Sequence, residues 1–464
     1  MVNMITKSFD KIKDVLQIIS NEVKFIKRKG GEITPINFVQ SLLGNNNKQT
    51  MSDEEICRDL YEDCNINLKR QSFNEWLHKD VSVEYLKKVF EKSLNINSIY
   101  NDEAIKGLSI HFKNIFIEDN TTISLHKMMN KIFKGVGGTA STSAMKIYYC
   151  YNAIANKIAD IQIFDGTKSD AKCSYNVLDF LQKGDLILRD LGFFKIDSFK
   201  KIIDKGAYFL SRYFLATNLY IEVDGNDKKM SILEFIKSKK EFDVLDTWVK
   251  LSNEKLLVRV IVYRVPDEVY NQRVRNLKKA DKHRGRTSNK SRFELQRYNI
   301  FITNIPSQMI DKKTIGTLYR FRWQVELVFK RWKSLLNINV ITTTSQKTED
   351  TPNKKGGKVS NRILCFIYAK LIGIILMSQI ENITTLLARK MERELSSDKF
   401  VKWMIAKDKL KMLFLGKDSI EKVCEWLKGN LERMLKDRRK KDPTIGVLLE
   451  NEVEFYLKGY NEKF

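Results

Sequence analysis

The order of strand and helix patterns between residues 114 and 214 constrains the fold of this chain more than any other feature of its sequence. Three runs dense in β-branched and aromatic residues come first, and helical and strand patterns then alternate. The strand patterns cover residues 114–119, 144–152, 157–166, 184–190 and 207–214, and the helical ones 170–182 and 197–206. We therefore predict an α/β domain.

The strand order within this domain brings two acidic residues together. The order β-β-β-α-β-α-β, with a meander of three strands first, is that of the ribonuclease-H-like fold, in which the first and fourth strands lie side by side. Asp119 is expected to end the first strand and Asp190 the fourth, so both should lie at one edge of the sheet. Asp165, at the end of the third strand, is the alternative to Asp119. Asp119 is preferred because the third strand is an edge strand in this topology.

The charge balance indicates the class of partner. The chain has 82 Lys and Arg against 57 Asp and Glu, a net charge of +25, which favours an anionic polymer such as nucleic acid. A Lys-rich codon bias from an AT-rich genome is the other explanation. The 30% of charged residues argues against a membrane protein. The longest apolar run, residues 363–377, contains Lys370 and is expected to form a buried helix.

Cysteine and histidine usage excludes two kinds of site. The six cysteines are far apart without a C-x2-C pair, and the four histidines are never spaced i, i+4. Neither a zinc site nor a disulfide scaffold is expected, which fits a reducing cytoplasm. The first residues lack the uninterrupted apolar segment of a signal peptide.

The first hundred residues are helical and basic. Ser52 and Glu55 have the spacing of a capping box and should open a short helix, and a second helix is expected over residues 68–79, with Lys69 and Arg70 near its start. Two short helices around a tight turn suit a helix-turn-helix that enters a DNA major groove. Any pair of surface helices has the same pattern, so this assignment is a hypothesis.

Residues 215–306 read as short β-strands interrupted by a basic tract, residues 272–292. We predict a β-rich insertion that presents a cationic loop, in which Arg284 and Arg286 contact DNA phosphates. A solvated loop is the alternative. A second polar loop, residues 342–362, should separate the central domain from a helical C-terminal region.

A single helix is expected over residues 318–336. At about 100° per residue, Tyr319, Arg322, Glu326 and Lys333 share a strip about 60° wide. The apolar residues of the segment gather on the other side: Phe321, Val325, Val328, Trp332 and Leu335.

Glu326 is a lone carboxylate among these cations. It could be a solvated salt-bridge partner of Arg322, four residues earlier. Alternatively, it could bind a divalent metal whose phosphate ligands are held by the neighbouring cations. With Asp119 and Asp190, it would complete a cluster of three carboxylates for two Mg²⁺ ions.

The same residues carry a family resemblance. Tyr319, Arg322, Glu326 and Lys333 match the signature Y-x2-R-x3-E-x6-K at every spacing, and residues 190–193, DLGF, match D-x-G-[YF]. Over residues 115–338 the chain resembles the DDE-type transposases of bacterial insertion sequences, specifically the cut-and-paste family with this signature.

The resemblance implies a metal-dependent DNA transposase. Asp119, Asp190 and Glu326 would be catalytic and bind two Mg²⁺ ions, with Mn²⁺ as a possible substitute. DNA would be bound by residues of the signature, the insertion and the N-terminal helices: Tyr319, Arg322, Lys333, Arg212, Arg284, Arg286, Lys69 and Arg70. The β-rich insertion would interrupt the ribonuclease-H-like core, and some family members flip a base against an aromatic residue of that insertion.

The resemblance also implies an organisation and partners. Five regions are expected: a helical DNA-binding region (1–105), the first part of the core (106–214), the insertion (215–306), the catalytic helix (307–345) and a helical dimerisation region (346–464). The partners would be double-stranded DNA, as terminal inverted repeats and target, and a second protomer in a synaptic complex. No membrane partner is expected, and the location would be the bacterial cytoplasm, at the nucleoid. A non-cutting DNA-binding relative or repressor, or another ribonuclease-H-like nuclease, are the alternatives.

Overall fold

The computed structural model describes residues 1–26, 33–43, 52–94, 106–138, 141–239, 241–338 and 358–436. The chain divides into two compact units. Unit 1 consists of residues 1–102, 120–168 and 325–441, and unit 2 of residues 103–119, 169–324 and 442–464. Strand β1 (Ile115–Ser124) and helix α13 (Trp323–Ser334) each contribute residues to both units.

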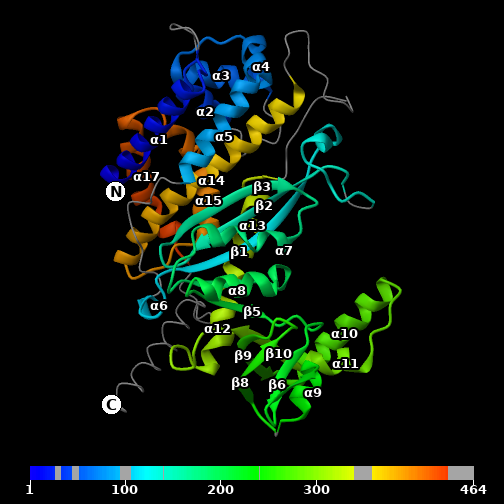
Figure 1. Ribbon diagram of the computed structural model, residues 1–464. Helices are drawn as coiled ribbons and strands as arrows, with labels where there is room; N and C mark the ends of the chain where they lie inside the picture. Colours follow the sequence, from blue (N-terminus) through cyan, green and yellow to red (C-terminus); the bar gives the residue numbers. More distant parts are fainter. Residues whose placement is uncertain are drawn as a thin grey trace. The chain divides into compact units, whose positions relative to one another are not determined.

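Unit 1 is mainly helical, and its longest helix, α14, packs against α1, α2, α4 and α5 (Figure 1). The helices are α1 (Val2–Glu22), α2 (Pro35–Leu43), α3 (Asp53–Cys64), α4 (Arg70–His78), α5 (Asp80–Leu94), α14 (Val359–Lys390), α15 (Ser397–Ala406), α16 (Lys409–Met412) and α17 (Lys417–Met434). The predicted capping box is confirmed: Ser52 accepts from the Glu55 N–H, and Glu55 accepts from the Ser52 N–H.

Helix α14 contains the apolar run predicted to be a buried helix. In the described part of the chain it is the one helix long and apolar enough to cross a membrane, but 83% of its most apolar window is buried. Lys370, in this run, donates to the carbonyl of Asn337 at 2.6 Å, and burial lowers its pKa to about 8. These properties are those of a core helix, as predicted.

Unit 1 also holds an antiparallel hairpin of β2 (Ala144–Asn152) and β3 (Lys157–Asp165). Strand β2 coincides with its predicted range, and β3 ends one residue earlier than predicted. The strand order here is β3-β2-β1, so β3 is an edge strand. The 3₁₀ helix η2 (Lys127–Lys131) lies between β1 and β2.

Unit 2 is built on a sheet with the strand order β1-β4-β5-β10-β9-β8-β6-β7. The pairs β1–β4 and β4–β5 are parallel, and the remaining neighbours are antiparallel. The strands after β1 are β4 (Leu186–Arg189), β5 (Tyr208–Arg212), β6 (Leu219–Val223), β7 (Asn226–Met230), β8 (Val244–Leu251), β9 (Leu256–Arg264) and β10 (Tyr298–Thr303). The predicted pairing of the first strand with the fourth is therefore confirmed.

Helices cover both faces of this sheet. Helix α8 packs against β5 through the stacked rings of Phe199 and Phe209, and α12 packs on β10 through Tyr319 and Phe301. The helices of unit 2 are α6 (Lys106–Ser109), α7 (Asp170–Cys173), η3 (Asn176–Asp179), η4 (Leu191–Phe193), α8 (Ile196–Asp204), α9 (Ile232–Lys237), α10 (Asp267–His283), α11 (Lys290–Glu294), η5 (Leu295–Arg297) and α12 (Lys312–Arg320). The helical pattern predicted at residues 170–182 is thus two short pieces, α7 and η3.

Strand β1 is longer than predicted. It continues to Ser124, so the prediction that Asp119 ends the strand is wrong: Asp119 lies at its centre. The extension keeps the alternation of a half-buried strand, since Thr121 and Ile123 are buried while Thr122 and Ser124 are exposed. Asp190, in contrast, directly follows β4, as predicted.

The basic tract predicted as a loop is mostly helical. Helix α10 covers residues 267–283 and α11 covers 290–294, and together they project from the sheet of unit 2 (Figure 1). Acidic residues in the first turn of α10 and Lys282 and His283 in its last turn complement the helix dipole. Only residues 284–289 form the loop between the two helices.

The single helix predicted over residues 318–336 is broken. Helix α12 ends at Arg320 and α13 begins at Trp323. At the break the N–H groups of Phe321 and Arg322 bond to the carbonyls three residues earlier, those of Leu318 and Tyr319. Such bonds tighten the chain into a 3₁₀-like turn. The strip drawn on one continuous helix therefore does not hold across Phe321 and Arg322.

A buried ion pair joins β1 to β4. The guanidinium of Arg189 lies 2.5 Å from the carboxylate of Glu118, and both side chains are fully buried. Arg189 also donates to the Ser198 hydroxyl on α8, at 2.8 Å, and to the carbonyl of Ser174. One arginine thus ties two strands, a helix and a loop of unit 2 together.

Breaking this pair should destabilise the fold more than breaking an exposed one. Arg189→Met leaves the Glu118 charge buried and should cost about 3–5 kcal/mol in the free energy of unfolding. The double variant Glu118→Leu with Arg189→Met should recover most of that loss. Urea denaturation followed by circular dichroism measures both.

Lys201→Met is the matched control, because it removes the exposed i, i+4 pair with Asp197 on α8. It should leave stability essentially unchanged. If Arg189→Met is as stable as Lys201→Met, the buried pair does not have the structural weight assigned to it.

Candidate active site

The register of unit 2 places Asp119 and Asp190 on one face of the sheet. Ile117 of β1 pairs with Leu188 of β4, so two residues further along Asp119 stands opposite Asp190. Side chains alternate along a strand, so Glu118 and Arg189, the preceding residues, lie on the other face with α8. The two acids and the buried ion pair therefore occupy opposite faces of the same strand pair.

Arg322 lies between the two acids. Its Nη1 is 3.7 Å from Oδ2 of Asp119, and its Nε is 3.9 Å from Oδ1 of Asp190. The arginine side chain is 9% exposed, whereas those of Asp119 and Asp190 are 20% and 39% exposed. Two carboxylates from adjacent strands thus share one positive charge at an accessible position.

Tyr319 also contacts this group. Its hydroxyl donates to Oδ1 of Asp190 at 3.3 Å, and its ring packs on Phe301 of β10 with centroids 4.8 Å apart. Burial raises the pKa of Tyr319 well above its ordinary value, and the nearby charge of Arg322 opposes that shift. The phenol therefore remains a neutral hydrogen-bond donor at physiological pH.

Arg212 belongs to the same face. It is the last residue of β5, is exposed, and pairs in register with Phe301, on which Tyr319 packs. Burial lowers the pKa of Arg273 on α10, and the charge of Arg212 adds to this shift. Arg212, Arg273 and Arg322 together give this part of unit 2 a positive charge beside Asp119 and Asp190.

Glu326 and Lys333 belong to unit 1, where both lie on α13. They are seven residues apart, two helical turns, so they share one face of that helix as predicted. Lys333 is exposed and Glu326 is partly exposed. On the apolar side Val325 and Trp332 are buried as predicted, and Trp332 packs edge-on against Tyr149 of β2.

The predicted DNA-binding residues outside this face are exposed. Lys69 precedes α4 and Arg70 begins it, after a turn that starts with Asn65 in the left-handed conformation. Arg284 and Arg286 lie in the loop between α10 and α11, which the buried Asp281 organises by accepting from the Ser288 N–H at 3.1 Å. These contacts with DNA remain predictions.

Asp165 has a local structural role. The N–H of Thr167 donates to its carboxylate at 2.9 Å, and the Thr167 hydroxyl donates to the same oxygen. The hydrogen bond from the hydroxyl lowers the pKa of Asp165. Since β1 is the neighbour of β4, these observations favour Asp119 over Asp165 as the partner of Asp190.

The sequence interpretation missed the residues that support the acids from behind. Glu118 and Arg189 each precede a candidate acid, and a signal for them exists: a charged residue inside an otherwise apolar strand, as in LILRD, demands a buried partner. Phe301 gives no such signal, because one aromatic residue in a strand is ordinary core.

The donor set suits a divalent cation. Carboxylate oxygens are the ligands that Mg²⁺ and Mn²⁺ prefer, and Asp119 and Asp190 already share a cationic neighbour. Across the described ranges, no group of three or more His, Cys, Asp or Glu side chains forms a metal-binding cluster. Within unit 2, Asp119 and Asp190 are the two carboxylates that share Arg322.

Comparison with known proteins shows which family this chain is similar to. Residues 110–349 match the family model described as "Transposase DDE domain". The chain is 28% identical over 410 residues to the transposase for insertion sequence element IS231B of Bacillus thuringiensis subsp. berliner, covering 83% of this chain and 81% of the relative. It is 28% identical over 397 residues to the transposase for IS1151 of Clostridium perfringens, covering 81% and 80%.

A solved structure of a piggyBac transposase synaptic complex with hairpin DNA is 10% identical, with a TM-score of 0.44, over 93% of this chain and 84% of that one. That similarity is too low to define the fold.

Paired carboxylates with basic neighbours at the parallel strands of a mixed α/β protein are features of enzymes that transfer phosphoryl groups. The family model covers more than half of the chain, and the chain belongs to the DDE transposase family. It is a DNA transposase, an enzyme that cuts DNA and transfers its strands. Enzymes of this family generally use divalent metal ions.

If Asp119 and Asp190 bind a cation, Arg322 should compete with it for the two carboxylates. Arg322→Gln removes a unit charge from about 4 Å away and should raise the affinity of the DNA-free protein for Mn²⁺ roughly fivefold. Titration calorimetry with MnCl₂ measures this, and circular dichroism checks the fold.

Arg264→Gln, a half-exposed arginine on β9, is the control and should leave Mn²⁺ binding unchanged. Equal Mn²⁺ affinities for wild type and Arg322→Gln would contradict a cation site at Asp119 and Asp190.

Proposed function

We propose that this transposase performs cut-and-paste transposition with a ribonuclease-H-like core whose catalytic carboxylates are Asp119, Asp190 and Glu326. The observation that carries the proposal is the Arg322 guanidinium placed between Asp119 and Asp190. This contact brings Arg322, a residue of the Tyr-Arg-Glu-Lys signature, next to Asp119 and Asp190, the first two predicted catalytic acids. Glu326, four residues after Arg322, is the remaining carboxylate of that signature.

The three acids would hold two Mg²⁺ ions, with Mn²⁺ as a substitute. When bound, such ions activate an attacking oxygen and stabilise the leaving oxygen in an in-line displacement. Tyr319, as a neutral donor, can bind a phosphate oxygen, and Arg322 and Lys333 can neutralise phosphate charge near the cleaved end. Arg322 would exchange its carboxylate partners for a phosphate when DNA is bound.

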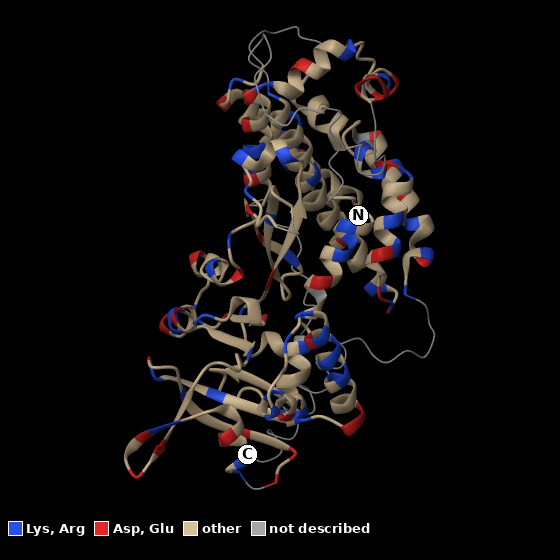
Figure 2. Cartoon of the chain, turned by 90° about the vertical axis from the view of Figure 1, so that its right-hand side faces the viewer, with Lys and Arg blue, Asp and Glu red and all other residues tan. Residues whose placement is uncertain are grey.

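We assign binding of the ends of the insertion element to exposed Lys and Arg side chains that are not part of the catalytic site. Lys69 and Arg70 begin α4, the second helix of the proposed helix-turn-helix, where a recognition helix carries its base contacts. Basic and acidic residues are interspersed along most of the helices and strands (Figure 2), so the net charge alone locates no DNA site.

The arm formed by α10 and α11 is the most basic segment in unit 2. Arg275, Lys278, Lys279 and Lys282 are exposed at i, i+3, i+4 and i+7, on one face of α10. Arg284 and Arg286 continue this surface in the following loop. We propose that this whole surface contacts phosphates of the DNA backbone.

The proposed organisation follows the five regions with boundaries at residues 105, 214, 306 and 345. The insertion would comprise residues 215–306, and residues 346–464 would pair two protomers in the synaptic complex. The partners would be terminal inverted repeats and target DNA in the bacterial cytoplasm, at the nucleoid. The polar loop predicted at residues 342–362 lies mostly outside the described residues.

Glu326→Gln tests the third ligand. The variant should bind labelled duplexes copied from the ends of the insertion element as wild type does, because it keeps the shape of the side chain. It should cut them at least a thousandfold more slowly with Mg²⁺, because a metal ligand is lost. Gel assays of binding and cleavage separate the two effects.

Glu425→Gln, an exposed glutamate of α17, is the control and should cut normally. Normal cutting by Glu326→Gln would remove Glu326 from the site. If wild type binds ends without cutting, or cuts only branched junctions, the cut-and-paste proposal is wrong.

Arg284→Gln with Arg286→Gln tests the basic arm. The double variant should bind duplex DNA more weakly and should flatten the plot of log affinity against log salt by about 1.8, because each lost phosphate contact contributes about 0.9. Fluorescence anisotropy over a range of KCl concentrations measures the slope.

Lys228→Gln with Lys229→Gln removes the same charge from exposed positions of the edge strand β7 and is the control. The loop is a solvated surface if both double variants show the same salt slope.

A further inference from the structure

Strand β9 holds the helix that carries Tyr319. Arg259, Ile261 and Tyr263 alternate onto one face of this strand, and Ile261 pairs with Phe301 of β10. Phe301 in turn pairs with Arg212 of β5. The residues of β9 therefore lie on the same sheet face as Asp190, and α12 packs on that face.

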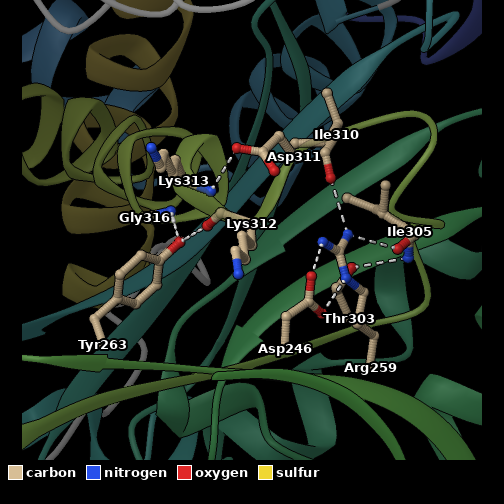
Figure 3. A network of polar contacts seen from close by, with 10 residues as sticks. All are labelled: Asp246, Arg259, Tyr263, Thr303, Ile305, Ile310, Asp311, Lys312, Lys313 and Gly316. Atoms are coloured by element: carbon tan, nitrogen blue, oxygen red, sulfur yellow. Dashed lines mark hydrogen bonds and ion pairs between the residues drawn. The ribbon is translucent and has the colours of Figure 1, made fainter. Parts of the chain in front are cut away.

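Arg259 fixes the loop that leads into α12. It is fully buried, and Asp246 of β8 accepts from it through both carboxylate oxygens at 2.7 Å. The same guanidinium donates to the carbonyls of Ile305 and Ile310, at 3.2 and 2.9 Å (Figure 3). The chain is thus tied to the sheet immediately before the helix begins at Lys312.

Tyr263 enters the first turn of α12. Its hydroxyl donates to the carbonyl of Lys312 and accepts from the N–H of Gly316 at 2.9 Å (Figure 3). This carbonyl and N–H are the i and i+4 groups that an α-helix bonds to one another. A hydroxyl that bonds both groups ties the first turn of the helix to β9 and so fixes the direction in which the helix leaves the sheet.

Gly316 lies against the ring of Tyr263. A Cβ at this position would lie 3.4 Å from the ring carbon Cζ of Tyr263 and 3.5 Å from its hydroxyl, which is ordinary van der Waals contact. The helix and the tyrosine are therefore packed together at this point. Tyr319, the residue that donates to Asp190, comes one turn after Gly316.

A second line of contact runs through the rings. Tyr263 packs edge-on against Phe301 with centroids 5.8 Å apart, and Phe301 packs against Tyr319 at 4.8 Å. Tyr263 therefore acts on α12 at both ends: through its hydroxyl at the first turn and through Phe301 at Tyr319.

We propose that Tyr263 is a positioning residue for DNA cleavage: its hydroxyl, bonded to Lys312 and Gly316, sets α12 so that Tyr319 reaches Asp190. The β-rich segment between the second acid and the signature thus braces the catalytic face in addition to presenting the basic arm. This inference rests on the proposed role of Tyr319.

The test compares Tyr263→Phe with Tyr220→Phe. The first variant keeps the ring on Phe301 but removes both hydroxyl hydrogen bonds to the first turn of α12, which leaves the helix free to shift. Tyr220→Phe loses its hydroxyl hydrogen bond to Asn253 at 2.7 Å, at β6, away from α12. Each variant should lower the melting temperature by about 1–2 °C.

Cleavage rates separate positioning from stability. With end duplexes and Mg²⁺ at 25 °C, Tyr263→Phe of the full chain should cut about tenfold more slowly, as a displaced catalytic group does, while Tyr220→Phe cuts normally. In a Tyr319→Phe background the effect of Tyr263→Phe should shrink to less than about twofold, because the displaced hydroxyl is already absent.

Two results would overturn the inference but leave the proposed function intact: a Tyr263→Phe rate equal to that of Tyr220→Phe, or a tenfold effect that persists without the Tyr319 hydroxyl. A Tyr319→Phe variant that cuts at the wild-type rate would overturn the proposed role of Tyr319 and the inference with it. These readings are distinguishable, because the single Tyr319→Phe variant reports on the proposed function alone.

Discussion

The parallel pairing of β1 with β4, locked by the buried pair Glu118–Arg189, is the constraint on which the candidate site of unit 2 depends. Because side chains alternate along strands, a contact that fixes residues 118 and 189 on one face also fixes residues 119 and 190 on the other. Burying the two charges costs free energy, but the buried charges are stable only when they are paired with each other, so few other registers of the two strands are possible. A purely apolar contact at these positions would tolerate small shifts that the proposed metal-binding role of the two carboxylates would not allow.

The opposite face of the sheet is organised from its β-rich side. Arg259 and Tyr263 of β9 hold the entry and the first turn of α12, and Phe301 supports Tyr319. The acids are therefore positioned by contacts beneath them and the signature residues by contacts beside them. Phosphoryl transfer depends mainly on position and charge, so in the proposed mechanism these supporting contacts would matter as well as the charged groups.

Local patterns allowed much of this fold to be predicted from the sequence. Strand β2 coincides with its predicted range, and the capping box at Ser52 forms. Asp190 follows β4 because an apolar run ends there. The errors arose where a pattern was ambiguous: the basic tract reads as a loop by charge, yet its partly buried residues recur at helical spacing in α10.

The sequence by itself determined which side chains are available: the acids, the signature and its spacing, and the excess of positive charge. Only the tertiary structure decided that the helix breaks at Phe321 and Arg322, that Asp119 lies within β1, and that Tyr263 accepts a hydrogen bond from Gly316. The physical reason is range. Periodicity reports hydrogen bonds and burial within one segment, whereas these three features depend on groups tens to hundreds of residues away, which local periodicity does not record.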